Sequence, residues 1–209
     1  ESLLDFRTLS YFSPALAGNR LQLDVSGKMS GYVDDFTFTD IDVNSRNGGF
    51  KGRASGSLSG LPEIEKTRLR ADLRDFIMTS EGLGDFVSEW MPGEKKLDIG
   101  RYARGTVFRL NGKGSGMMNR LSVNADLTSL LGNVTADVRL DNLIRKNRPI
   151  GISGSVSTDD LDLGKIIETD IIGPVTMKSV LKAELGNKEE GIDIAIDTLK
   201  VDRLYANGY

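Results

Sequence analysis

The strongest constraint on the fold of this chain is an internal repeat marked by paired glycines. Residues 27–31 (GKMSG) recur as residues 112–116 (GKGSG), and the sequence that follows each copy has the same pattern of apolar and polar residues. A third copy begins at Gly186. A period of roughly 80 residues is longer than one solenoid coil and long enough for several strands, so the repeat predicts an array of similar multi-strand units.

The glycine pairs divide the chain into four segments. Residues 1–26 are predicted to be the end of a preceding unit plus a strand that leads into the first glycine pair. Residues 27–111 form the first unit, 112–185 the second, and 186–209 the start of a third that stops early. The array therefore has about two and a half units, and we expect the chain to be a segment of a longer protein.

Apolar residues alternate with polar ones along most of the chain, which is the pattern of half-buried strands. The clearest run has Val134, Ala136, Val138 and Leu140 on one side of the alternation and polar side chains on the other. Short polar turns separate such runs, for example around Pro62. Strands joined in this way are most simply antiparallel, because a parallel pair needs a long crossover.

Helices are predicted only as short pieces at equivalent places in the units. One apolar stripe has helical spacing behind two candidate caps, Thr79 and Ser80, and its residues are Leu83, Phe86, Val87 and Trp90. Its counterpart, with Leu163, Ile166 and Ile167, follows Thr158 and Asp159 as candidate caps. The opening residues 3–14 are interpreted as the tail of an earlier helix. Each stripe needs cover, so the helices are expected to plug an end of the sheet or lie across it.

Many of the 24 glycines lie within predicted strands, where a glycine weakens the strand unless the chain must bend or another group must approach closely. Strand glycines that bend a sheet would curl it around its long axis. The alternative is that these glycines only end short strands. The expected fold class is all-β with a few short helices, in which repeated antiparallel strands form one long curled sheet.

Composition limits the chemistry. The chain has no histidine and no cysteine, so the commonest general base and the thiolate nucleophile are both missing. Its net charge of −3 argues against a nucleic-acid surface. Residues 112–116 do not have the spacing of a phosphate-binding loop. Paired aspartates such as Asp34 with Asp35, or Asp159 with its neighbours, leave a glycosidase or a calcium site open. We expect no enzyme activity, no cofactor and no metal.

Several short elements, taken in order over nearly the whole chain, resemble the repeat region of TamB-like proteins of the AsmA-like superfamily, in the form found in Bacteroidetes. The elements are Ser10-Tyr11-Phe12-Ser13-Pro14, the glycine pair of residues 27–31, Gly60-Leu61-Pro62, Leu97-Asp98-Ile99-Gly100, Leu161-Asp162-Leu163-Gly164 and Tyr205-Ala206-Asn207-Gly208-Tyr209. No apolar run approaches the roughly 20 residues that cross a bilayer, so the chain itself is expected to contain no membrane anchor.

The resemblance implies a taco-like trough that spans the periplasm and shields the acyl chains of phospholipids as they move between the inner and outer membranes. It also implies a role in the assembly of outer-membrane proteins. For a full-length protein the implied partners are an inner-membrane anchor and an outer-membrane barrel of the BamA or TamA type, with no nucleic acid. The implied location is the periplasm.

The alternation selects the residues expected to line the apolar side of the trough. They are Leu21, Leu23, Val25, Phe36, Phe38, Leu121, Val123, Val134, Ala136, Val138, Leu140, Ile152, Ile192, Ile194 and Ile196. A purely structural repeat scaffold, such as a surface adhesin or a spacer, remains an alternative and would bury this apolar side fully against itself. A carboxylate-pair hydrolase would instead require Asp34, Asp35 or Asp159 to converge with a second acid in one cleft.

Overall fold

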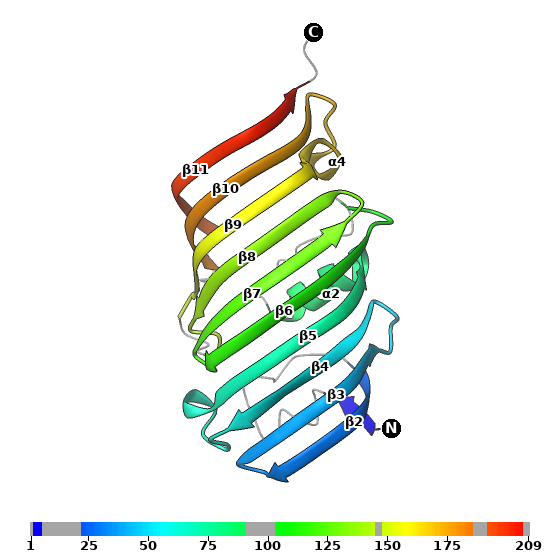
Figure 1. The fold of residues 1–209 in the computed structure, drawn as a ribbon, viewed down its shortest axis with the longest axis vertical. Helices are drawn as coiled ribbons and strands as arrows, with labels where there is room; N and C mark the ends of the chain where they lie inside the picture. Colours follow the sequence, from blue (N-terminus) through cyan, green and yellow to red (C-terminus); the bar gives the residue numbers. More distant parts are fainter. Residues whose placement is uncertain (1, 6–21, 91–102, 145–147, 186–191, 207–209) are drawn as a thin grey trace.

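In the computed structural model, strands follow one another as neighbours from one end of the sheet to the other (Figure 1). The structure describes residues 2–5, 22–90, 103–144, 148–185 and 192–206. The strands are β1 (Ser2–Asp5), β2 (Gln22–Tyr32), β3 (Asp35–Ser45), β4 (Phe50–Ser59), β5 (Arg68–Thr79), β6 (Val107–Met117), β7 (Arg120–Ser129), β8 (Gly132–Asp141), β9 (Ile150–Asp162), β10 (Ile172–Leu185) and β11 (Ile192–Ala206).

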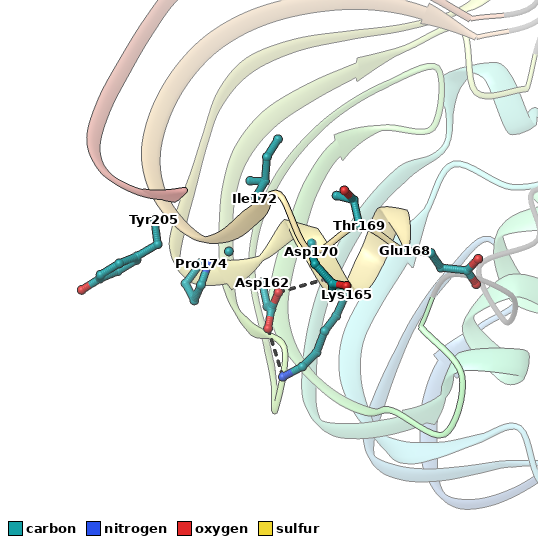
Figure 2. A pocket seen from close by; sticks show the side chains of 10 residues that line it. Asp162, Lys165, Glu168, Thr169, Asp170, Ile172, Pro174 and Tyr205 are labelled. Atoms are coloured by element: carbon teal, nitrogen blue, oxygen red, sulfur yellow. Dashed lines mark hydrogen bonds and ion pairs between the residues drawn. The ribbon is translucent and has the colours of Figure 1, made fainter. Parts of the chain in front are cut away.

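All neighbouring strands are antiparallel, and the spatial order is the order in sequence. Within the described residues β1 does not pair with β11, so the sheet is open. The strands curve, and the helices lie on the concave side (Figure 2). This confirms the predicted all-β fold class of a curled antiparallel sheet with a few short helices.

The helices are α2 (Ser80–Trp90), α4 (Leu163–Ile167) and a 3₁₀ turn, η2 (Ile64–Lys66). α2 follows β5 and α4 follows β9, so each helix comes after the fourth strand of a group, β2–β5 or β6–β9. Strands β10 and β11 begin a third group. The repeat positions Gly27 and Gly112 lie inside the first strand of their groups, β2 and β6.

The two helix starts are built in the same way. Thr79 ends β5, and its Oγ1 accepts a hydrogen bond from the N–H of Gly82 at 3.0 Å. Asp162 ends β9, and its Oδ1 accepts one from the N–H of Lys165 at 3.0 Å. Thr79 and Asp162 each also donate a backbone hydrogen bond to a turn carbonyl, Gly49 at 2.9 Å and Leu131 at 2.7 Å.

These contacts confirm the predicted cap at Thr79 and correct two other predictions. Thr158 and Asp159 do not cap α4, because both lie within β9, where Thr158 is buried and bonded to the backbone of Val175. Leu3, Leu4 and Asp5 are not helical, because they form β1 and pair with the start of β2. The rest of the segment 3–14 lies outside the described residues.

Three aspartates with positive φ mark irregularities in the ladder that bend the strands. Asp40, Asp75 and Asp160 have φ of 47°, 49° and 47°. They lie where β3, β5 and β9 carry one residue more than the strand they pair with. A β-bulge of this kind bends the bulged strand and increases its twist. Bending was predicted at the strand glycines, and the bulges at these aspartates were not predicted.

Each bulge has its backbone N–H satisfied by a side chain of the next strand. The N–H of Asp40 donates to Ser55 Oγ at 3.0 Å, that of Asp75 to Asn111 Oδ1 at 2.9 Å, and that of Asp160 to Thr176 Oγ1 at 3.1 Å. These three acceptors take the place of the ladder partners that the bulges displace, and they tie the irregular backbone to the adjacent strand.

Glycine contributes to the curvature as well. Gly154 in β9 has φ of 145°, and a Cβ there would overlap the carbonyl oxygen of Asp137 in β8. Gly56 in β4 has no unusual φ, but a Cβ there would run into the carbonyl oxygen of Arg70 and the ring of Phe38. Both glycines are therefore required by close approach of a neighbouring strand and do not simply end a strand.

The core lies on the concave side, where α2 and α4 pack on the sheet. Leu23, Phe50 and Met78 are buried together, and Ala103, Phe108 and Leu131 form a second buried group. Leu83 of α2 packs against both groups, and Ile166 of α4 packs against the second. The helices thus lie across part of the apolar side, which is one of the two predicted placements.

Candidate functional site

The strand register separates the sheet into an uncharged face and a polar face. Residues paired across antiparallel strands point to the same side, so the pairs can be followed from β2 to β11. One such row runs Leu121, Leu140, Ile152, Ala183 and Ile194. At the inner positions followed in this way, no described residue is charged. We call this side the inner face, and the opposite, polar side the outer face.

The register places the predicted lining residues together on this face. Leu23 and Val25 lie on β2, and Phe36 and Phe38 on β3, where Phe38 is opposite Met29. Val123 and Val138 are directly opposite on β7 and β8. The rest of the set in described strands is Leu121, Val134, Ala136, Leu140, Ile152, Ile192, Ile194 and Ile196, and Leu21 lies outside the described residues. Whether these residues contact lipid stays a prediction.

Sequence reasoning missed the inner-face residues of β4, β5, β6 and β10. In β5 the inner residues change from Leu73 to Phe76 across the bulge at Asp75, so the spacing of two is broken. In β6 three successive inner positions are glycines. The missed residues include Phe50, Leu58, Leu69, Phe108, Leu110, Val175, Met177 and Leu181. Alternation with one inserted residue per strand would have predicted the inner residues of β5, because the bulge adds one residue between Leu73 and Phe76.

The inner face has a strip without side chains along β6. Gly112, Gly114 and Gly116 occupy consecutive inner positions, between Ala71 and its neighbours on β5 and Val123 and its neighbours on β7. A Cβ added at Gly114 would come no closer than 4.0 Å to the carbonyl oxygen of Ser122. At Gly114 there is consequently free space above the backbone of β6, whereas a Cβ at Gly112 or Gly116 would meet the backbone of β7.

The few inner-face hydroxyl groups are bonded to the sheet itself. Ser45 Oγ donates to the carbonyl of Phe50 at 3.0 Å and accepts from its N–H at 2.8 Å. Thr158 Oγ1 donates to the carbonyl of Val175 at 3.0 Å, and Ser179 Oγ to that of Val156 at 3.3 Å. All three side chains belong to buried residues. These groups therefore offer little hydrogen bonding to a polar ligand, and the face suits an apolar one.

Cover of the inner face differs along the sheet. Phe50, Met78 and Phe108, near α2, are 4–7% exposed. Val123 and Val138 in the middle are half-buried. On β11 the inner residues Ile194, Ile196, Leu199, Val201 and Leu204 are 47–57% exposed. The apolar face is thus covered where α2 packs on β4, β5 and β6, and exposed on β11, the last strand of the described sheet.

A hollow of about 540 Å³ lies where α4 meets β10 and β11 (Figure 2). Its lining combines Asp162, Lys165, Glu168 and Asp170 with Ile172, Pro174 and Tyr205. Lys165 Nζ is 3.0 Å from Asp162 Oδ2. The hydrogen bond from the Lys165 backbone N–H, together with this side chain, lowers the pKa of Asp162 below its usual value. Tyr205 and Glu168 point away from each other at opposite ends of the view, so the side chains do not converge on one ligand position.

The acids considered for catalysis are not brought together. Asp34 and Asp35 lie at the turn between β2 and β3, whereas Asp159 lies on β9 opposite Asn133, several strands away. Among the described residues no group of three or more acidic side chains could hold a metal ion. In the part of the chain that the structure describes, Asp34 and Asp35 therefore do not share a cleft with Asp159.

Comparison of the chain with protein-family models, with curated proteins and with solved structures finds no match. In the part of the chain that the structure describes, no helix is long and apolar enough to span a bilayer. The function therefore has to be argued from the inner face and from the short sequence elements that resemble TamB-like repeats.

Proposed function

We propose that the inner face of the curled sheet is a lipid-shielding groove, and that the chain is a periplasmic segment of a TamB-like or AsmA-like protein that carries phospholipids between the inner and outer membranes. The observation that carries this proposal is the continuous, uncharged inner face that runs through the strands from β2 to β11. The family and the periplasmic location in this proposal come from the resemblance of the sequence elements to TamB-like repeats.

The energetics favour an acyl chain as the ligand. Removing acyl carbon from water stabilises the bound state by about 0.8 kcal/mol per methylene. The half-buried inner residues of β7 and β8 leave apolar surface, and Gly114 on β6 leaves space, for such a chain. The buried hydroxyls of Ser45, Thr158 and Ser179 are already bonded within the sheet, so they would not have to be desolvated on binding.

In the full-length protein we expect the implied partners, an inner-membrane anchor and a BamA-type or TamA-type outer-membrane barrel, to hold the trough between the membranes. A role in outer-membrane protein assembly belongs to the same proposal. Neither partner can bind the groove itself if the groove is occupied by phospholipid, so they are expected to contact other parts of the protein.

The proposal is tested by extracting the purified protein with organic solvent and measuring co-purified phospholipid by mass spectrometry. The test variant carries Val123→Asp and Val138→Asp, which place charges on the inner face of β7 and β8. The matched control carries Ser122→Asp and Asn124→Asp, which add the same charge to the outer face of β7. Each single inner variant is included, because two carboxylates directly opposite each other repel.

Near-stoichiometric phospholipid in the wild type and in the outer-face control, with loss in the inner-face variants, is the expected result. Circular dichroism must show that the inner-face variants retain strand structure. Protein that contains no phospholipid under conditions where it is folded contradicts a groove that works in this segment.

A structural repeat scaffold, in the manner of an adhesin or spacer, is favoured by a different observation. Phe50, Met78 and Phe108 are buried under α2 without any ligand, as in an ordinary core. A scaffold predicts that Val123→Asp affects only stability. The lipid proposal predicts that the same variant also changes what the protein carries, so the extraction experiment separates the two.

A further inference from the structure

The outer face carries a row of directly paired residues in which no position is acidic. The row crosses nine strands, from β2 to β10, and each member is opposite the next in the register. Six positions are hydroxyl residues, namely Ser30, Thr37, Ser57, Ser115, Ser122 and Ser153. The other three are the cations Arg70, Arg139 and Lys182. We call this set the hydroxyl–cation row.

The side chains of the row make little use of their hydrogen-bonding capacity within the protein. None of the six hydroxyl groups, nor Arg70, has a side-chain hydrogen bond or ion pair in the part of the chain that the structure describes. Arg139 and Lys182 each have one carboxylate at 3.8 Å, Asp141 and Asp197. Seven of the nine residues are exposed, and Ser57 and Ser153 are half-buried.

Of the three row cations, Arg70 has no ion pair in the described part of the chain, whereas Arg139 and Lys182 are paired much as other outer-face cations are. Arg53 and Arg109 lie on either side of Asp75, at 3.8 and 3.9 Å. Arg74 holds Asp72 at 3.1 Å, and Arg120 holds Asp141 at 3.1 Å. The rows beside the hydroxyl–cation row do contain carboxylates, and Asp72 and Asp141 are two of them. The nine positions of the row thus hold three positive charges and no negative one, on a chain whose net charge is −3, and carboxylates outside the row contact two of these cations.

Its dimensions suit an extended ligand. Neighbouring strands are about 4.8 Å apart, so nine strands span roughly 38 Å along the length of the sheet. Cations occur at intervals of three and two strands, and hydroxyl groups fill the positions between them. Arginine binds carboxylates and phosphates well, and serine hydroxyls can both donate and accept hydrogen bonds.

From this arrangement we propose that the hydroxyl–cation row binds a linear acidic polysaccharide that lies across the strands on the outer face. The charge selects an anion, the length selects a polymer, and the hydroxyls match a ligand that is itself rich in hydroxyl groups. The row contains no aromatic or aliphatic side chain that could insert into a lipid surface, and it lies on the face opposite the concave, helix-covered side (Figure 2). This binding is independent of the apolar inner face.

The test is a binding titration of the folded wild-type chain with polygalacturonate at low salt, with dextran as the uncharged polymer. The row variant carries Arg70→Ser and Arg139→Ser. The matched control carries Arg53→Ser and Arg109→Ser, which remove the same charge from outer-face positions of β4 and β6. Poly-glutamate and vesicles that contain phosphatidylglycerol are measured in parallel, and circular dichroism checks that both variants are folded.

We expect polygalacturonate to bind and dextran not to bind, with the affinity falling as salt is raised. The row variant should lose about tenfold in affinity, roughly threefold per cation, and the control less than twofold. No binding of polygalacturonate, or equal losses in the two variants, would overturn the proposal. So would tighter binding to poly-glutamate or to the vesicles, because the row would then serve a protein or a membrane. The row variant leaves the inner face intact, so its phospholipid content should equal that of the wild type.

Discussion

Two regions of the inner face, the part of β4, β5 and β6 that lies under α2 and the part on β11, carry the same kind of residue but differ in how much of it is covered. Phe50, Met78 and Phe108 have strands on both sides and α2 above them, and they are almost fully buried. Ile194 and Ile196 on β11 have a neighbouring strand on one side only within the described residues, and more than half of each side chain is exposed. Alternation in the sequence thus specifies the face a residue occupies and leaves its burial undetermined.

The difference matters because burial, and not the pattern, sets how much a residue stabilises the fold. A covered region gives the sheet a core of its own, and an uncovered region leaves apolar side chains in contact with water. A core and a ligand-binding surface therefore require different regions of the same inner face.

The largest expected effect is a difference in stability between a substitution under α2 and one on β11. Phe50→Ala should lower the free energy of unfolding by about 3–5 kcal/mol, because it leaves a cavity among Leu23, Met78 and their neighbours. Ile194→Ala should cost about 0.5 kcal/mol, since the side chain already contacts water. Urea denaturation followed by circular dichroism measures both. Equal losses would mean that β11 is covered in solution, and the contrast between the two regions would be wrong.

A second comparison concerns two inner-face glycines at the same level of the sheet. Gly56 and Gly114 both pair with Ala71, one from each side. Gly56→Ala should destabilise by about 1–3 kcal/mol, because the new methyl group overlaps the backbone of Arg70. Gly114→Ala should change stability by less than about 0.5 kcal/mol, because its methyl group enters free space.

The same urea titrations apply to the glycine pair, and the lipid extraction adds a second reading. If the strip along β6 holds an acyl chain, Gly114→Ala should reduce co-purified phospholipid although the fold is unaffected. A folded Gly114→Ala protein with unchanged phospholipid would remove the glycine strip from the proposed groove without excluding the rest of the inner face.

The smallest effect compares the caps of α2 and α4. Asp162→Ala should cost about 1 kcal/mol at pH 7, and Thr79→Ala a similar amount. The pKa of Asp162 is lowered in the folded protein, so the stabilisation from its charged form is complete above about pH 5. It is lost as the pH falls below the unfolded value, about 3.9, and through the folded one.

The cost of Asp162→Ala should therefore shrink in acid, whereas that of Thr79→Ala should change less, because a hydroxyl has no charge to lose. Thermal unfolding of both variants between pH 7 and pH 3 provides the measurement. A cost of Asp162→Ala that stays constant over this range would show that the charged carboxylate is not what stabilises the start of α4.

Much of the architecture could be predicted because regular strands show themselves in the sequence. The run from Val134 to Leu140 alternates without interruption, and the register places it as predicted. The stripe containing Leu83 also predicted α2 correctly. Both signals come from side-chain periodicity, which depends only on local geometry.

What could not be predicted depends on irregular backbone or on contacts between distant residues. The bulge at Asp75 interrupts the alternation of β5, and an isolated aspartate in a strand gives no sign that it adopts a positive φ. Thr158 looked like a helix cap because a threonine before an apolar stripe usually is one, but the strand continued to Asp162. The hydroxyl–cation row is visible only when the register joins residues from nine strands.

The bulged aspartates also bear on how such a sheet could change its length during evolution. At three bends, in β3, β5 and β9, one aspartate is paired with one acceptor on the adjacent strand, as with Asp40 and Ser55 or Asp160 and Thr176. The pairs between β6 and β9 contain no such irregularity. These bends therefore depend on two adjacent strands only, so a repeat unit could be duplicated or deleted without changes in the remaining strands.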